Sequence, residues 1–181
     1  MKPIGEMAVA ELGAYVASHL RGRDIDVVLS GGSCVSIYSR GTYVSMGLDL
    51  VNTRFAKRKR IREAMAEIGF QEQGRSFTHP DTGFLVEFPA GPLAVGQEPA
   101  QRVDELTLPT GTLRIISATD CVKDRLAGYY HWDDRQCLAQ AVLVAQANDV
   151  DLGEIEQWSD REGKGDEFRR IEEKLARTYM A

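Results

Sequence analysis

Residues 27–51 read VVLSGGSCVSIYSRGTYVSMGLDLV, and the order of elements in this stretch decides the fold. The β-branched run that begins at Ile25 is too short for a buried helix and predicts a strand over 25–29. Gly31 and Gly32 predict a tight turn, and a short helix follows in CVSIYSR. Alternating polar and apolar residues over 42–51 predict a second strand. The stretch is therefore expected to form a strand, a glycine turn, a short helix and another strand.

The segments on both sides extend this unit into a larger fold. Apolar residues at helical spacing from Met7 to Leu20 predict an opening helix that ends at Gly22, and another helix is expected over 54–68. Hairpins are expected over 70–96 and over 103–116, and helix formers dominate from Asp120 onward. We therefore expect an α/β (α+β) fold, with a mixed-sheet domain over 1–117 and a helical region over 118–181 packed on it.

The composition is typical of a soluble globular protein. The chain has 181 residues, of which 43% are hydrophobic and 27% charged, and this excludes disorder. Its net charge of -5 argues against nucleic-acid binding driven mainly by electrostatics. No apolar stretch approaches the roughly 20 residues that cross a bilayer, and the start MKPIGEMAVAELG lacks a signal-peptide core. We expect a cytoplasmic protein that has no contact with a membrane.

The turn of Gly31, Gly32 and Ser33 is the first candidate for chemistry. Glycines let backbone amides approach a phosphate, and the start of the next helix adds partial positive charge. Ser33 can cap that helix or bind a phosphate oxygen. When these residues are taken alone, an ordinary strand-to-helix turn with a serine cap is the favoured explanation.

Acidic side chains inside two predicted strands are the second candidate. Side chains two apart on a strand point the same way, so Ser45, position 47 and Asp49 are expected on one face. A buried acid is costly unless it meets a cation or hydrogen-bond donors, and Glu87 in FLVEF raises the same question. Two such carboxylates near a phosphate-binding turn suit Mg²⁺ or Mn²⁺. The alternative is an acid at a sheet edge that pairs with a nearby arginine.

Residues 25–90 resemble the nucleotidyltransferase superfamily, in which a Gly-Gly-Ser turn and a short helix precede a strand bearing Asp-x-Asp. The similarity is greatest to small bacterial nucleotidyltransferase-like proteins related to the toxins of abortive-infection systems. In that family the turn holds nucleotide phosphates, while the strand aspartates and a later carboxylate bind metal. The resemblance implies that Asp49 and Glu87 are catalytic and metal-binding. It also implies a set of nucleotide-binding residues, namely Gly31, Gly32, Ser33, Ser45 and Lys123.

Gly47 departs from the family pattern because it stands where the first aspartate is expected. That aspartate typically bridges two metals, so glycine removes a charge and a ligand from the centre of the site. Three explanations compete: a degenerate pseudoenzyme, an inactivating substitution introduced into this sequence, or a compensating carboxylate such as Asp24 or Asp26.

Charged and aromatic residues after the sheet form a third candidate. Lys123 lies near the start of a predicted helix and could reach triphosphate oxygens, as a lysine does in toxin-like relatives. Alternatively, Lys123, Asp124 and Arg125 decorate a solvated helix face. The aromatic cluster 129–132 could stack a base, or it could fill a core or an interface.

A run of cations in RFAKRKRIR contrasts with the acidic composition of the chain. A solvated helix face is the favoured explanation, and contact with an RNA backbone is the alternative. The six cations are Arg54, Lys57, Arg58, Lys59, Arg60 and Arg62.

The sequence thus predicts a protein that binds a nucleoside triphosphate and Mg²⁺ and, if active, transfers a nucleotidyl group to an acceptor hydroxyl. RNA such as tRNA, a protein side chain and a small molecule all remain open as acceptors. The alternative is a non-catalytic nucleotide- or protein-binding module of a toxin–antitoxin-like system. The sequence leaves the oligomeric state open.

Overall fold

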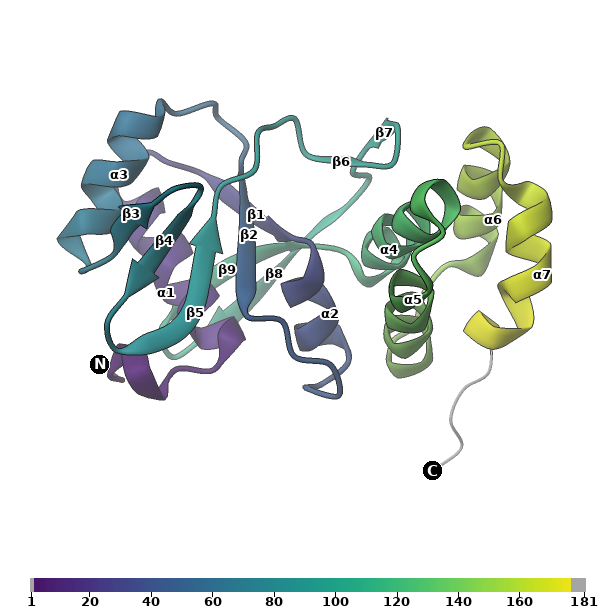
Figure 1. Ribbon diagram of the computed structural model, residues 1–181, viewed down its shortest axis with the longest axis horizontal. Helices are drawn as coiled ribbons and strands as arrows, with labels where there is room; N and C mark the ends of the chain where they lie inside the picture. The colour runs from purple at the N-terminus through teal and green to yellow at the C-terminus, as the bar shows by residue number, and fades with distance from the viewer. Residues whose placement is uncertain (1, 177–181) are drawn as a thin grey trace.

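The computed structural model describes residues 2–176 and confirms the mixed α/β fold (Figure 1). A seven-stranded sheet has the order β3-β4-β5-β2-β1-β9-β8, and β6 pairs with β7 in a separate hairpin. The strands are β1 (Val27–Ser30), β2 (Gly47–Asn52), β3 (Gln71–Gln73), β4 (Ser76–His79), β5 (Thr82–Glu87), β6 (Ala94–Val95), β7 (Glu98–Pro99), β8 (Val103–Leu108) and β9 (Gly111–Ile116). The helices are η1 (Ile4–Glu6), α1 (Val9–Arg21), α2 (Gly32–Tyr38), α3 (Arg58–Glu67), α4 (Ala118–Trp132), α5 (Arg135–Ala147), α6 (Leu152–Arg161) and α7 (Gly165–Ala176).

One face of the central strands is apolar and packs on α1. Leu29 of β1 pairs with Leu50 of β2, and both side chains are fully buried. A Cβ on Gly13 of α1 would lie 3.2 Å from side-chain atoms of Leu48 and Leu113. Glycine therefore lets α1 approach β2 and β9 closely, and this packing leaves the opposite face of the sheet to carry polar side chains.

Two predicted elements are shorter in the structure than the sequence pattern suggested. The strand expected over 42–51 begins only at Gly47, because the amide of Ser45 donates to the Ser36 hydroxyl (2.7 Å). The helix expected over 54–68 begins at Arg58. The Asn52 side chain donates to the Ala56 carbonyl (2.9 Å) and stabilises the preceding loop as a non-helical turn.

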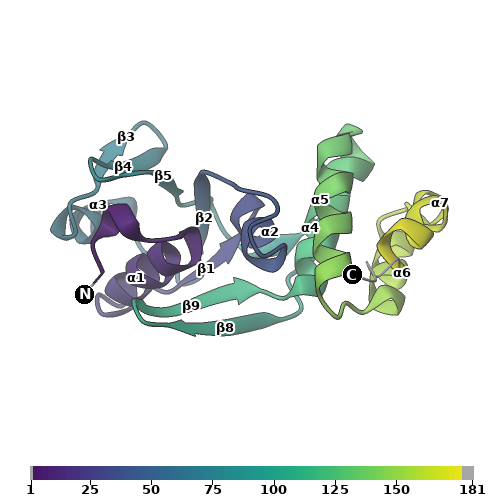
Figure 2. The ribbon, with the colours of Figure 1, turned by 90° about the horizontal axis from the view of Figure 1, so that it is seen from below.

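The helices α4 to α7 lie at one end of the sheet, beside α2 (Figures 1 and 2). Ser117 follows the last strand and caps α4 by accepting a hydrogen bond from the Asp120 amide. The Asn148 side chain after α5 donates to the Tyr38 carbonyl (2.9 Å) and links this region to α2. The division into 1–117 and 118–181 stays a prediction. Within residues 2–176, no helix is both long enough and apolar enough to cross a membrane.

Candidate functional site

The polar face of the central sheet brings two carboxylates together. Asp49 of β2 and Glu87 of β5 are direct partners in a parallel strand pair, so their side chains share one face. On the other side of β2, Asp49 is paired with Ser30, the last residue of β1. The Glu87 carboxylate accepts a hydrogen bond of 2.5 Å from the Ser76 hydroxyl. Asp49 and Glu87 therefore sit side by side next to the turn that follows β1.

The glycine turn lies directly against Asp49. Gly31 has φ +70° and ψ -154°, and a Cβ there would overlap the Asp49 carboxylate. A Cβ on Gly32 would lie 3.1 Å from the Ser45 hydroxyl oxygen. The structure therefore brings five of the predicted site residues together: Gly31, Gly32, Ser45, Asp49 and Glu87. Gly31 has to be glycine both for its backbone conformation and for this close approach.

Ser33 takes a different role from the two predicted for its hydroxyl. The α2 N-cap is Gly31, with no side-chain cap, and the buried Ser33 hydroxyl instead donates to the Gly47 carbonyl. This bond fastens the first turn of α2 to the start of β2. The Ser33 hydroxyl is therefore already engaged as a donor. The Ser33 backbone amide lies in the first turn of α2, where backbone amides have no intrahelical acceptor.

Gly47 leaves open space at the centre of the polar face. No atom outside the local chain lies within 4 Å of a Cβ built at this position. Its strand partner is Leu85, which is partly exposed on the same face as Asp49 and Glu87. No neighbouring side chain therefore fills the space that the first aspartate of the family pattern would occupy.

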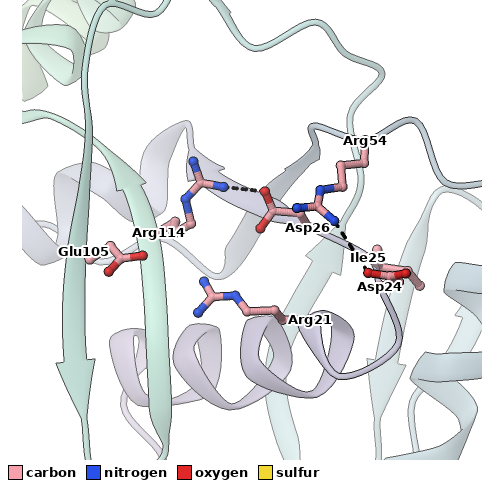
Figure 3. A pocket seen from close by; sticks show the side chains of 7 residues that line it. All are labelled: Arg21, Asp24, Ile25, Asp26, Arg54, Glu105 and Arg114. Atoms are coloured by element: carbon pink, nitrogen blue, oxygen red, sulfur yellow. Dashed lines mark hydrogen bonds and ion pairs between the residues drawn. The ribbon is translucent and has the colours of Figure 1, made fainter.

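Asp24 and Asp26 do not replace that carboxylate, because they lie before β1, at the opposite end of the strand from Ser30. Asp26 pairs with Arg114 and Asp24 with Arg54 (Figure 3). They line a cavity of about 550 Å³ whose three arginines are matched by three acids. Because these charges are balanced, this cavity offers no net attraction to a polyphosphate.

The pKa of the Asp49 carboxyl is raised to about 6. Burial is the main cause, the charge of Glu87 adds to it, and the charge of Arg125 partly offsets it. The nearby charge of Glu87 disfavours ionisation of Asp49, and a cation between the two carboxylates would reverse this effect. The site therefore carries an unfavourable concentration of negative charge.

Asp124 and Arg125 of α4 are largely buried, contrary to the alternative of a solvated helix face. The charges of both side chains act on the pKa of Asp49, Arg125 lowering it and Asp124 raising it. The Arg125 guanidinium binds the Asp124 carboxylate at 2.5 and 3.1 Å, and both side chains are largely buried. The solvated-face interpretation is therefore wrong for these residues. The sequence signal that could have identified them is the adjacent Asp-Arg pair in the N-terminal half of a predicted helix.

Lys123 is directed elsewhere. Its side chain is only 1% exposed, and its ammonium group pairs with Asp120 and Glu154. The Asp120 carboxylate also accepts hydrogen bonds from the amides of Gln101 (2.7 Å) and Arg102 (3.0 Å). The idea of a solvated face is wrong here too. Nucleotide binding by Lys123 stays a prediction, but its contacts indicate a role in fastening α4 to α6 and to the start of β8.

The cations of 54–62 are mostly exposed, and several are neutralised by acids. Arg58 and Arg62 both contact Glu72, and Lys59 lies 3.8 Å from Glu63 within α3. Arg58 also lies 4.7 Å from the centre of the Phe77 ring. This face therefore presents less free positive charge than the sequence suggested.

Two carboxylates match the way Mg²⁺ is usually held in phosphoryl-transfer sites, where one or two protein oxygens are completed by water and substrate phosphates. Asp49 and Glu87 are the residues that would hold it. Among residues 2–176, no group of three or more His, Cys, Asp or Glu side chains could hold a metal ion. The two carboxylates therefore fit a Mg²⁺ ion that protein and phosphate bind jointly better than a metal ion that is bound by protein alone.

We predict that Asp49→Asn stabilises the metal-free protein. Because folding raises the Asp49 pKa from 3.8 to about 6, the folded state retains a proton that the unfolded state loses in this interval. The free energy of unfolding therefore falls as pH rises from about 4 to 6 and stays lower above it. The Asp49→Asn variant has no carboxyl at this position and does not show this decrease. We expect its free energy of unfolding at pH 7.5 to exceed that of the unmodified protein by about 1–2 kcal/mol after allowance for solvent screening. Urea denaturation in EDTA at pH 4.5 and 7.5 measures the difference.

Asp24→Asn is the matched control, because the Asp24 side chain is 84% exposed at the far end of β1. It should leave the stability unchanged at both values of pH. A loss of stability in Asp49→Asn at pH 7.5 would mean that the carboxylate is held by favourable donors, contrary to the raised pKa.

Comparison with known proteins extends these observations. No family model matches the chain, and no curated protein matches it in sequence. Among solved structures it is similar to the antibiotic-resistance factor ANT(2'')-Ia, with a TM-score of 0.51 and 14% sequence identity over 92% of this chain and 94% of that one. A likeness at this identity concerns the fold, and it extends through the helical region as well as the sheet. The chain therefore has a nucleotidyltransferase-like fold, as residues 25–90 predict.

Proposed function

We propose that the protein binds a nucleoside triphosphate with Mg²⁺ beside Asp49 and transfers the nucleotidyl group to an acceptor hydroxyl. The observation that carries the proposal is the pairing of Asp49 with Glu87 on adjacent strands, directly against the Gly31 turn. Catalytic carboxylates and a glycine turn at one place in the sheet are what phosphoryl chemistry needs, because it depends on positioning and electrostatic stabilisation.

Each part of the site has a distinct task in this proposal. The backbone amides of Gly32 and Ser33 contact phosphate oxygens, and Asp49 and Glu87 hold the cation. The Ser45 hydroxyl donates to the Gly47 carbonyl (3.1 Å) and contacts a phosphate only after rotating away from it. When bound, Mg²⁺ supplies charge neutralisation and polarises the phosphoryl group. The glycines leave room for the phosphates to approach the backbone.

The transfer itself is a displacement at the α-phosphorus. The acceptor oxygen forms a bond to this phosphorus, the bond to the bridging oxygen breaks, and pyrophosphate leaves. The hydroxyl proton passes to a carboxylate of the site. An RNA such as tRNA, a protein side chain and a small molecule are the acceptors to be tested.

A thermal shift tests nucleotide binding. Millimolar nucleoside triphosphate with Mg²⁺ is expected to raise the melting temperature, because a ligand at about 100-fold excess over its Kd stabilises the folded state by roughly 2.7 kcal/mol. Asp49→Asn should abolish the part of this rise that depends on metal, and Asp24→Asn should leave it intact. If neither nucleotide nor metal changes the melting temperature, the proposal fails.

A second candidate function is a non-catalytic nucleotide- or protein-binding module, for instance one member of a toxin–antitoxin-like pair. The specific observation in its favour is Gly47, which leaves the centre of the site without a carboxylate. Either module predicts that no label passes from [α-³²P]-labelled triphosphate to total RNA or to proteins of a cell extract, and the nucleotide-binding module also predicts that triphosphate binds.

A further inference from the structure

Two adjoining cavities form a groove that begins at a carboxylate of the candidate site. The first, of about 470 Å³, is lined by Glu87 itself, by Arg75 in the β3–β4 turn and by Arg58 of α3. The second, of about 280 Å³, is lined by Arg58 and by Phe55 in the loop before α3. Arg58 and the chain segment 88–90 line both cavities, so the two are continuous. We call them together the α3 groove, which leads from Glu87 to Phe55.

The order of the strands decides which substrate can use this groove. Because β2 lies between β1 and β5, Asp49 has the Gly31 turn on one side and Glu87 on the other. Neighbouring strands are about 4.8 Å apart, so the backbone of Glu87 is one strand spacing from Asp49. In phosphoryl transfer, the attacking and leaving oxygens lie roughly in line through the phosphorus. When the pyrophosphate end of the triphosphate lies at the Gly31 turn, the acceptor oxygen has to approach from the side of Glu87, where the groove begins.

The end of the groove at Glu87 carries a local surplus of positive charge. Arg58 and Arg62 of α3 contact Glu72 at 2.7 and 3.5 Å, so two guanidinium groups share one acid. Arg58 also donates to the Arg75 carbonyl (3.0 Å), and the Arg75 side chain adds a third, exposed guanidinium at the β3–β4 turn. Guanidinium groups bind phosphate oxygens through paired hydrogen bonds. With Glu87 occupied by the cation, this end of the groove therefore attracts a phosphate.

Phe55 is held as an exposed ring at the other end of the groove. Its side chain is 69% exposed, and its φ of +53° is a backbone conformation that bulky side chains rarely adopt. The buried Asn52 side chain fixes the loop on both sides of this ring. It accepts from the Arg54 amide (3.3 Å) and donates to the Ala56 carbonyl (2.9 Å). Backbone strain that the surroundings fix in this way gathers at functional sites. The loop therefore presents a flat aromatic face to the groove.

The lining of the groove indicates the chemistry of the acceptor. A positively charged groove with an aromatic stacking platform is the combination by which proteins hold single-stranded nucleic acid. Since the net charge of the chain is -5, the local arginines and the ring must supply this binding, not the charge of the whole protein. Stacking accepts any base, so the groove should show little preference for sequence.

We infer that the α3 groove holds the acceptor, and that this acceptor is the end of a single-stranded nucleic acid. Its terminal hydroxyl lies at Glu87, a phosphate lies at Arg58 and Arg75, and a base stacks on Phe55. The inference rests on the proposed function, since it selects RNA among the three acceptors of the same site. The terminal oxygen forms the bond to the α-phosphorus, pyrophosphate leaves, and the proton passes to a site carboxylate. The strand becomes one nucleotide longer.

Fluorescence anisotropy of labelled oligonucleotides of about 12 nucleotides tests this inference. Single strands should bind, with separate RNA and DNA samples to show which sugar is preferred, and the duplex of the same sequence should bind more weakly. Phe55→Ala should weaken binding of the single strand about 10-fold or more, whereas Phe55→Trp should retain most of the affinity. Arg75→Ala should weaken binding and lower the slope of log K against log salt concentration by about 1.

Two exposed residues away from the groove are the matched controls. Trp132, from the aromatic cluster 129–132, is 82% exposed at the end of α4, and Arg135 is exposed at the start of α5. Trp132→Ala and Arg135→Ala should bind the single strand like the unmodified protein. All four alanine variants should keep the rise in melting temperature with nucleoside triphosphate and Mg²⁺.

The outcomes separate this inference from the proposed function. If Phe55→Ala and Arg75→Ala bind single strands with unchanged Kd, or if the duplex binds equally well, the groove does not hold a single strand and the inference fails. If no oligonucleotide binds while triphosphate still raises the melting temperature, the acceptor belongs to another class, and the proposed function stands without the inference. If triphosphate does not raise the melting temperature, the proposed function itself fails, and the inference fails with it.

Discussion

Gly47→Asp is expected to raise metal-dependent nucleotidyl transfer by about 100-fold or more. The substitution places a carboxylate two residues before Asp49 on the same face of β2, where the family pattern has its first aspartate. A central ligand contributes several kcal/mol to transition-state stabilisation, and each 1.36 kcal/mol is tenfold in rate. The Cβ of the new side chain meets no obstacle, since no atom outside the local chain lies within 4 Å of it. Label transfer from [α-³²P]-labelled triphosphates to total RNA and cell extract measures the gain.

Gly47→Asn is the matched control for this gain, because it has the same shape as aspartate without the charge. It should transfer no more label than the unmodified protein, and so should the double variant Gly47→Asp with Asp49→Asn. Robust transfer by the unmodified protein, equal to that of Gly47→Asp, would show that the cation is held in another way. Asp124 would then be the carboxylate to test, because it acts on Asp49 from α4.

The part of the site that is local in sequence could be predicted from it. The turn of Gly31 and Gly32 and the strand with Asp49 lie within 25 residues, and the period of two along a strand fixes which side chains share a face. The position of Glu87 relative to Asp49 depends on strand pairing, and the parallel register of β2 and β5 places the two residues side by side. Such pairing is plausible from patterns but is decided only by the folded sheet.

The contribution of α4 could not be predicted in the same way. A helix pattern gives the spacing of a face but not its partner, and the sequence DCVKDRLAG mixes charges around the whole helix. The structure buries Asp124 and Arg125 as an ion pair and directs Lys123 toward Glu154 of α6. The hydrogen bond of the Ser33 hydroxyl could not be predicted for a related reason, because its acceptor, the Gly47 carbonyl, lies 14 positions later.

Lys123→Ala is expected to destabilise the protein by about 3–5 kcal/mol, the range for removal of one partner from a buried ion pair. Asp120, whose side chain is 1% exposed, would keep its charge without the ammonium group that now lies 3.3 Å away. The two backbone amides that bind Asp120 offset only part of that cost. The Lys123 pocket would also lose packing, since this side chain is one of the largest that are fully buried. Urea denaturation at pH 7.5 measures the loss.

Lys59→Ala is the matched control, because the Lys59 side chain is 76% exposed on α3 and its contact with Glu63 is a surface pair. It should change the stability by less than about 0.5 kcal/mol.

The Lys123→Ala variant also tests the role predicted for Lys123 from the family resemblance. If Lys123→Ala keeps full stability but loses binding of triphosphate more than of monophosphate, the ammonium group reads terminal phosphate charge and the ion pairs with Asp120 and Glu154 are dispensable. Lys123→Met keeps most of the aliphatic stem, so it should recover only the part of the loss that comes from packing. The stability that Lys123→Met does not recover then measures the cost of leaving Asp120 without its ammonium partner.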